Sequence, residues 1–255
     1  MKIRINNKIV FSDNNKPIIV AEVSANHQGI KSRFLKHILE AKKAGLFTTL
    51  HTGGASIPGS FPITGADLID INPHVSFHIN GGPVSMEDKY FEIVARDTDI
   101  VMQVCTAGNL RTTFLCAEMA RKHGAFERFL IATDTPTGSG VMPLGLIYTI
   151  SQIASLTSFE VPELIAAATG NVAKCYGLNS GFLKPSFDAD IVLIDAPLGG
   201  TKVDALAALK NGDPCAIGAV ITAGVPRFVG RSNNTPPPIR EIKVLRSNVM
   251  NVFQG

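Results

Sequence analysis

The sequence predicts an α/β protein of the (β/α) barrel type with a small β-sandwich-like appendage at its C-terminal end. Short apolar runs rich in β-branched residues alternate with stretches of helical periodicity up to about residue 178. After that point the pattern changes to short strands with tight turns. The 255 residues are 45% hydrophobic and 18% charged, which is enough for a sizeable core and excludes disorder for most of the chain. Alternating strands and helices imply a parallel sheet with right-handed crossovers.

Five strand–helix units are expected in order along the barrel part. The expected strands cover 17–23, 47–51, 74–79, 99–105 and 128–133. The expected helices cover 31–44, 85–96, 110–124, 144–156 and 161–176, and Gly45 follows the first as its C-cap. Since five units cannot close an eight-stranded barrel, the barrel is partial or is completed by a partner, and we expect a homo-oligomer.

The change of pattern predicts three parts. Residues 1–178 form the barrel-type domain, with a junction near residue 45, and residues 179–231 form the β-rich appendage. Residues 232–255 form a proline-rich linker and tail, since they begin with SNNTPPPIR.

Composition and charge exclude several classes of function. The 24 Lys and Arg exceed the 21 Asp and Glu by only three and form no basic runs, so no nucleic-acid partner is expected. No apolar stretch reaches about 18 residues, so no membrane partner is expected. The first residues lack the apolar core of a signal peptide. Four scattered cysteines without a CxxC pair are typical of reduced thiols, which predicts a cytoplasmic protein.

Polar residues at strand ends indicate a site. His51 and His78 end two expected strands and Asp134 follows a third, with separations of 27 and 56 residues that match one and two strand–helix units. Because ligands bind beyond the carboxyl ends of parallel strands, the three side chains are expected at one mouth. Two imidazoles and a carboxylate suit zinc or a similar divalent ion, which lowers the pKa of bound water toward about 7. Asp134 is then either a ligand or the proton acceptor.

Structural roles are the alternative for the same residues. A histidine at a strand end is often a hydrogen-bonded structural residue, and Asp134 could simply cap the following turn. His37 and His74 are interpreted as surface or packing residues, and His123 as a partner of a helix dipole. Cys105 also ends a strand, and a buried thiol is favoured there over a nucleophile.

The glycine loop HTGGASIPGS contributes a second element of the expected site. Glycines allow backbone amides to approach a bound anion, so Gly53 and Gly54 are candidate substrate-binding residues. The loop matches neither the dinucleotide nor the Walker pattern, so nucleotide binding has no motif support.

Several long stretches of the sequence resemble those of a known family. LHTGGASIPGS, SFHINGGP, ATDTPTGSGVMPLG, IASLTSFEVPELIAAATGN, YGLNSGFLKPSFDADIVLID and RSNNTPPP lie between about 47 and 238. They resemble the C-terminal half of the enamidases, which belong to the amidohydrolase superfamily. The resemblance implies a (β/α)8 barrel with a small β-sandwich, two zinc ions, and hydrolysis of the cyclic amide 6-oxo-tetrahydronicotinate. It implies that His51 and His78 are the metal histidines of barrel strands five and six, and Asp134 the aspartate of strand eight.

The chain departs from that pattern at its start. The family opens with a His-x-His pair on strand one, whereas no two of the six histidines here are two residues apart. Instead, residues 1–45, with AEVSANHQG, resemble the first strand–helix unit of a sialic or pseudaminic acid synthase, a chimera-like arrangement. Glu22, Asn26 and His27 match the residues that border the phosphoenolpyruvate and sugar site of that family.

Three functions follow as hypotheses. The first is a metal-dependent amidohydrolase that acts on a small-molecule cyclic amide with one or two ions. The second is a non-catalytic, vestigial barrel fragment that oligomerises through its open sheet edges. The third is a sialic-acid-synthase-like condensing enzyme.

Overall fold

A computed structural model describes most of the chain as two compact units. The described residues are 2–5, 8–12, 28–54, 58–82, 84–135, 140–230, 232–243 and 245, with side chains from residue 28 onward. The first unit covers residues 1–142 and the second covers residues 143–255.

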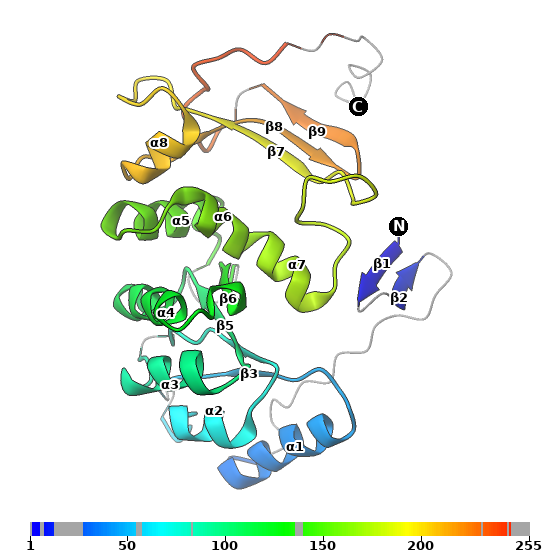
Figure 1. Cartoon of the computed structure of the whole chain (residues 1–255), viewed down its shortest axis with the longest axis vertical. Coiled ribbons are helices and arrows are strands. Elements are labelled where there is room, and N and C mark those ends of the chain that lie inside the picture. Colours follow the sequence, from blue (N-terminus) through cyan, green and yellow to red (C-terminus); the bar gives the residue numbers. More distant parts are fainter. Residues whose placement is uncertain are drawn as a thin grey trace. The chain divides into compact units, whose positions relative to one another are not determined.

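A four-stranded parallel sheet in the order β3-β4-β5-β6 forms the centre of the first unit (Figure 1). Its strands are β3 (Thr49–His51), β4 (Val75–Phe77), β5 (Val101–Cys105) and β6 (Phe129–Ala132). A separate antiparallel hairpin consists of β1 (Lys2–Ile5) and β2 (Lys8–Ser12). The strand order follows the chain order, as expected when helical crossovers connect parallel neighbours.

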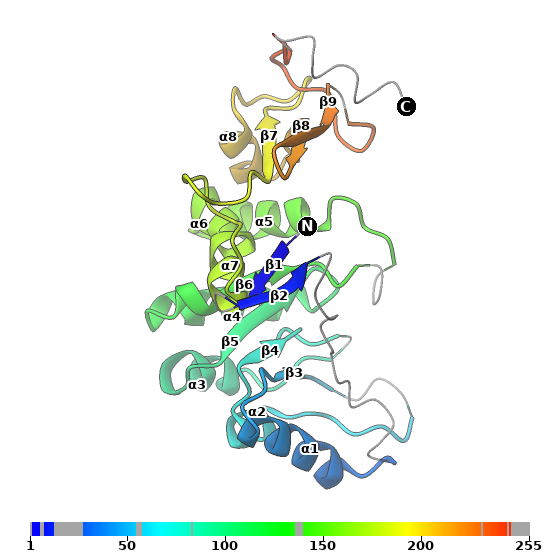
Figure 2. The ribbon, with the colours of Figure 1, turned by 90° about the vertical axis from the view of Figure 1, so that its right-hand side faces the viewer.

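Helices connect these strands. They are α1 (Lys31–Lys43), α2 (Gly65–Ile71), α3 (Lys89–Asp97), α4 (Leu110–Lys122) and the short 3₁₀ helix η1 (Phe126–Arg128). Figure 2 shows α2, α3 and α4 in a row on one side of the sheet. Helix α2 begins with a capping box, in which Thr64 and Asp67 exchange hydrogen bonds between side chain and backbone.

Burial differs between the cross-strand rows of this sheet. One row is fully buried and consists of Leu50, Ser76, Met102 and Phe129. On the opposite face His51 pairs with Phe77, and there His51 is exposed and Phe77 is half-buried. Since paired residues of parallel strands share a face, His51 and Phe77 belong to the face that a barrel turns inward.

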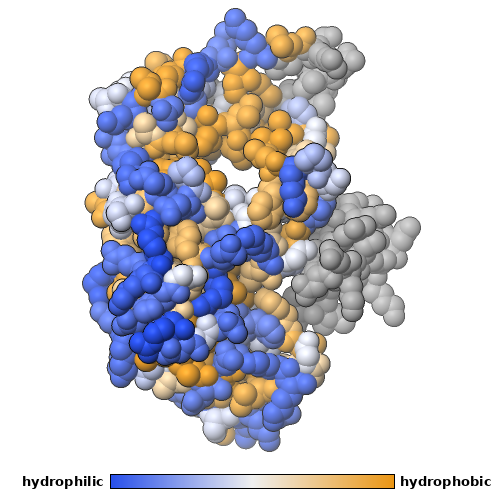
Figure 3. Space-filling view, viewed as in Figure 1, coloured by the Kyte–Doolittle hydropathy of each residue, from blue (hydrophilic) through white to orange (hydrophobic). Residues whose placement is uncertain are grey.

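The second unit combines helices with an antiparallel sheet in the order β7-β8-β9. Its elements are α5 (Gly145–Leu156), α6 (Val161–Ala168), α7 (Gly170–Tyr176), β7 (Ile191–Asp195), α8 (Ala205–Lys210), β8 (Ala216–Thr222) and β9 (Val225–Val229). Figure 3 shows hydrophobic residues along β7 and mostly hydrophilic ones over α3 and α4 of the first unit. The side chains of Val192 and Leu193 on β7 are 53% and 44% exposed.

The described elements confirm most of the predicted ones. Four expected strands are present, the segments expected to be helical contain helices, and the β-rich appendage contains an antiparallel sheet. The expected strand 17–23 lies outside the described residues. Within the described part, the parallel sheet has four strands, and neither closure of a barrel nor a second sheet in the appendage is seen.

Three local expectations need correction. The continuous helix 161–176 is two helices, because the backbone of Thr169 leaves the helical region at φ −131° and ψ −80°. Helix α2 lies in a segment that we expected to be loop, and its capping box outweighs the glycines and prolines around it. Helix α8 lies in the segment expected to be β-rich, between the stretches 180–195 and 218–230 that are interpreted as strands, and Asp204 caps its first turn.

Candidate active site

The three polar residues predicted at strand ends lie at or just beyond the carboxyl ends of three strands of the parallel sheet. His51 is the last residue of β3, His78 directly follows β4, and Asp134 follows β6. The strand β5 lies between those of His78 and Asp134. This spacing agrees with the resemblance, which implies strands five, six and eight.

The side chains of these residues lie close to one another. The rings of His51 and His78 have centroids 4.9 Å apart and are tilted by 40°. The Nε2 atom of His78 lies 3.4 Å from Oδ2 of Asp134. His78 is buried, whereas His51 is exposed and so is 30% of the Asp134 side chain, so solvent reaches the group at these two residues.

An unusual backbone conformation brings the His78 ring to this place. His51 pairs with Phe77, so strict alternation along β4 would turn residue 78 to the face opposite His51. His78 instead has φ +54°, which ends the strand, and its ring lies beside that of His51. Asp134 has φ +60°. Such left-handed conformations cost about 1–3 kcal/mol each in residues other than glycine and cluster at functional sites.

The donor atoms of His78 and Asp134 suit a divalent ion. With metal–ligand bonds of about 2.0–2.1 Å, two ligands of a tetrahedral ion lie about 3.3–3.4 Å apart, which matches the separation of 3.4 Å between Nε2 and Oδ2. That distance is long for a charge-assisted hydrogen bond. The Nδ1 atom of His78 is buried and has no hydrogen-bond partner among the described residues, which is costly unless a ligand or water engages the ring.

The complete triad is not assembled as a metal site. Among the residues that the structure describes, no three His, Cys, Asp or Glu side chains are arranged to hold one ion together. The separation of Nε2 of His78 and Oδ2 of Asp134 suits two ligands of one ion. The ring of His51 lies beside that of His78.

The surroundings of the site tune its ionisable groups. His51 is exposed as a residue, but the groups packed around its ring remove part of the water there. This desolvation, and then the nearby His78, lower the pKa of His51 below 6.5, although Asp134 acts in the opposite direction. The His51 imidazole is therefore neutral at pH 7, the form that binds a metal ion. Burial raises the pKa of the Cys105 thiol to about 11. Cys105 is thus an inert buried thiol at neutral pH, in agreement with the structural alternative weighed for it.

The two glycines predicted to bind substrate already use their amides within the fold. The Gly53 amide donates to the carbonyl of Ile63, and the Gly54 amide donates to that of Val84. Their role in substrate binding stays a prediction that requires these bonds to be exchanged. The other predicted substrate residues, Glu22, Asn26 and His27, lie outside the described residues.

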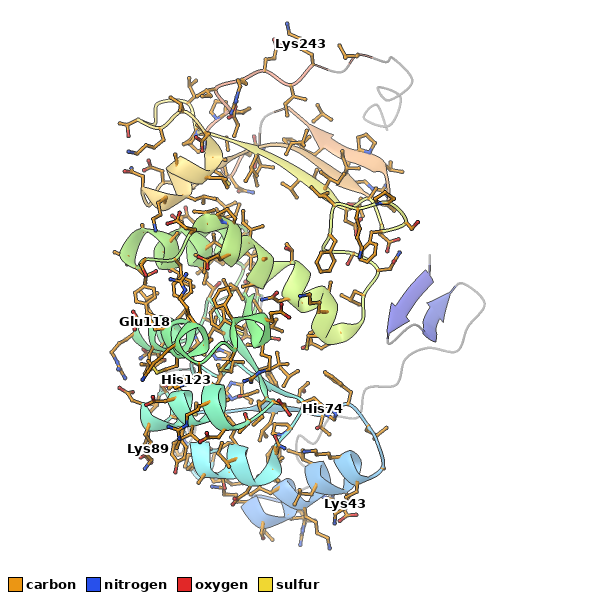
Figure 4. The ribbon with its side chains drawn as sticks, in the orientation of Figure 1. Lys43, His74, Lys89, Glu118, His123 and Lys243 are labelled. Carbon is orange, nitrogen blue, oxygen red and sulfur yellow. The ribbon has the colours of Figure 1, made fainter. Side chains whose placement is uncertain are left out.

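Other histidines have structural surroundings. His74 precedes β4, and its Nδ1 accepts a hydrogen bond from the backbone amide of Thr48. His123 ends α4 and lies 3.1 Å from a carboxylate oxygen of Glu92. The two lie on different elements (Figure 4), and His37 is exposed on α1. These observations agree with the packing and surface roles expected for them.

The sequence patterns missed a buried polar residue next to the site. Asn80 is fully buried, two residues after His78, and its carboxamide bonds to both backbone groups of Cys105. The motif SFHINGGP contains this residue, but an asparagine before two glycines reads as a solvent-exposed turn. Only the fold shows that its side chain is inside.

Comparison with known proteins places the chain in a family. The sequence model of the Amidohydrolase family matches residues 7–226, most of the chain. The chain belongs to the amidohydrolase family. The match begins before residue 45, so it includes most of the segment in which a synthase-like start was predicted, and the comparisons do not show that resemblance.

Three relatives define the similarity. The enamidase of Eubacterium barkeri is 37% identical over 205 residues, which is 80% of this chain and 53% of that protein. A crystal structure of enamidase has a TM-score of 0.78 at 35% identity and covers 84% of this chain and 55% of that one. A 5-methylthioadenosine/S-adenosylhomocysteine deaminase from Archaeoglobus fulgidus is 32% identical over 44% of this chain and 28% of that protein.

The chain thus spans about half the length of the enamidases that it matches. The likeness supports the barrel-type fold and the enamidase part of the predicted relationship. Within the described residues, no helix has the length and hydropathy needed to cross a membrane.

Proposed function

We propose that this chain is a metal-dependent amidohydrolase that opens a cyclic amide of the 6-oxo-tetrahydronicotinate type. The observation that carries the proposal is the gathering of His51, His78 and Asp134 at the ends of β3, β4 and β6 in a chain of this family. The 37% identity to an enamidase supports the choice of substrate class.

His51, His78 and Asp134 have different roles in the proposed reaction. Zinc or a similar divalent ion, held by His78 and Asp134 with His51 as a further donor, would supply a water of pKa near 7 and polarise the amide carbonyl. Hydrolysis forms a carbon–oxygen bond, breaks the carbon–nitrogen bond, and requires a proton on the departing nitrogen. Asp134, partly exposed and facing His78, accepts the proton of the attacking water and delivers it to that nitrogen.

The backbone around the site keeps these groups in place. Buried His78 loses little side-chain freedom when it binds, because its ring is already packed beside that of His51. After Asp134, the hydroxyl of Thr135 donates to the carbonyl of Gly140 and accepts from the amide of Met142. Such preorganisation lowers the entropy cost of assembling the reacting groups.

Metal analysis of the purified full chain tests the proposal. We expect about one zinc-type ion per chain, and we expect His51→Ala and His78→Ala to lose it. The control is His74→Ala, which removes the same imidazole from the opposite end of β4, where it is bonded to Thr48. Absence of metal in the unmodified chain, or equal loss in His74→Ala, would contradict the proposal.

Activity and size measurements separate the alternatives. Ring opening of the cyclic amide, followed by chromatography, should depend on Asp134 and should disappear in Asp134→Asn. Metal binding without hydrolysis, together with a dimer in solution, would favour the vestigial fragment that associates through its sheet edges. Phosphate release from phosphoenolpyruvate with an N-acetylated hexosamine would favour the synthase-like hypothesis, which rests on residues 1–45.

A further inference from the structure

The turn after β4 is built around one buried side chain. Residues 78–81 form this turn, in which the amide of Gly81 donates to the carbonyl of His78. The carboxamide of Asn80 lies underneath and is fully buried. It therefore occupies a position where every polar atom needs a partner.

Asn80 extends the bonding between β5 and the segment after β4. The backbone of that segment still reaches β5 at Ile79, whose amide donates to the carbonyl of Gln103. The Nδ2 atom of Asn80 donates to the carbonyl of Cys105 at 2.9 Å, and its Oδ1 accepts from the amide of Cys105 at 3.0 Å. In a parallel sheet, two residues of the neighbouring strand would satisfy these backbone groups of Cys105 at the end of β5. The side chain thus takes the place of the backbone partners of Cys105, and it does so two residues after His78, whose backbone has φ +54°.

Helix α4 secures the same turn from the other side. Nδ2 of Asn80 also donates to the hydroxyl of Thr113 at 2.8 Å, and the hydroxyl of Thr112 donates to the carbonyl of Asn80 at 3.0 Å. Thr112 and Thr113 are buried in the first turn of α4, which Asn109 caps. Both polar atoms of the Asn80 carboxamide, and the backbone carbonyl of Asn80, are therefore hydrogen-bonded to β5 or α4.

The chain also leaves space for this carboxamide at one glycine. A methyl group on Gly108 would lie 2.1 Å from Nδ2 of Asn80, although the backbone of Gly108 is not in the left-handed region. Alanine at 108 is thus prevented by Asn80 rather than by its own backbone.

We propose that Asn80 is a positioning residue whose buried carboxamide fixes the left-handed turn at His78 and so holds the His78 ring beside His51 and Asp134. Asn80 acts through His78 and does not face the reacting groups itself. This inference rests on the proposed function, because it concerns the same site. A measurement of the metal-free chain tests the position of the His78 ring even if the chain neither binds metal nor hydrolyses the amide.

Ring proximity in the full, metal-free chain provides the direct test. The rings of His51 and His78, 4.9 Å apart, should give nuclear Overhauser effects between their protons. The stacked rings of Phe47 and His74, 4.8 Å apart in the same unit, serve as the internal reference. In Asn80→Ala we expect the first contact to be lost and the second to persist. Retention of both contacts, or loss of both, would overturn the proposal.

A second variant separates positioning from loss of the side chain. Gly108→Ala displaces the carboxamide without removing it, so it should also abolish the His51–His78 contact. In the double variant, Gly108→Ala should have no effect beyond that of Asn80→Ala on the His51–His78 contact, because the carboxamide with which the new methyl group would clash is absent. An unchanged contact in Gly108→Ala would overturn the proposal. If the chain binds zinc, both single variants should weaken that binding 10–100-fold, as loss of supporting hydrogen bonds around metal ligands does.

Discussion

The ion pair between Asp195 and Arg240 gives a quantitative prediction about the second unit. Asp195 ends β7 and is 7% exposed. Its carboxylate accepts from the amide of Ala196 at 2.8 Å, from the amide of Arg240 at 3.0 Å, and from the guanidinium of Arg240. The pair joins residues 45 positions apart and anchors the proline-rich segment 232–240 to the sheet, so Asp195→Asn should destabilise this unit.

The pKa of Asp195 sets the size of the effect. Hydrogen bonds from Arg240, and then those from the backbone amides, lower this pKa from 3.8 to about 2, although burial opposes the shift. At 1.36 kcal/mol per pH unit, the difference corresponds to about 2.4 kcal/mol at neutral pH. Solvent screens the guanidinium of Arg240, whose side chain is 68% exposed, and reduces the expected contribution to on the order of 1–2 kcal/mol.

The effect has a defined pH dependence. Because the folded carboxyl has the lower pKa, the unfolded chain binds more protons between pH 4 and pH 2. The stabilisation is therefore complete above about pH 5, falls to roughly half at pH 3, and is lost as the pH falls through about 2.

Urea unfolding, followed by circular dichroism, measures the stabilisation that the Asp195 carboxylate contributes. The free energies of unfolding of the unmodified chain and Asp195→Asn should differ more at pH 6.5 than at pH 3. The control is Glu241→Gln, which removes one negative charge from an exposed neighbour and should change stability little at either pH. A difference of equal size at both pH values would refute the reasoning.

Two further predictions concern the first unit. Phe91 of α3 is fully buried, so Phe91→Ala should lower the free energy of unfolding by about 3–5 kcal/mol, measured in urea; a cost below about 1 kcal/mol would contradict its place in the core. Cys105 has a pKa of about 11 and is 3% exposed, so a disulfide reagent at pH 8 should modify half-buried Cys175 first and Cys105 only on unfolding; equal rates in the folded chain would be inconsistent with the structure.

Local pattern determined much of the fold. Runs such as FTTLH and DIVMQVC are short, apolar and bounded by turn residues, so their identity as strands could be predicted from the chain alone. The same alternation of strands and helices placed His51, His78 and Asp134 at the carboxyl ends of strands of one parallel sheet. These predictions succeed because they depend on residues close together in sequence.

Tertiary structure decided the details of the site. The register of β3 against β4 and the left-handed turn at His78 determine on which side of the sheet its ring lies. That turn depends on Asn80, Cys105 and Thr113, which are up to 33 positions apart. The amides of Gly53 and Gly54 have partners that no local pattern indicated.

The sequence by itself therefore determined which strands exist and which residues end them, because hydrophobic periodicity and turn chemistry act over a few neighbouring residues. Only the tertiary structure decided that the His78 ring crosses to the side of His51 and that Asn80 is buried beneath it. The physical reason is that a buried carboxamide and a left-handed residue are stable only when hydrogen-bond partners from distant strands and helices surround them.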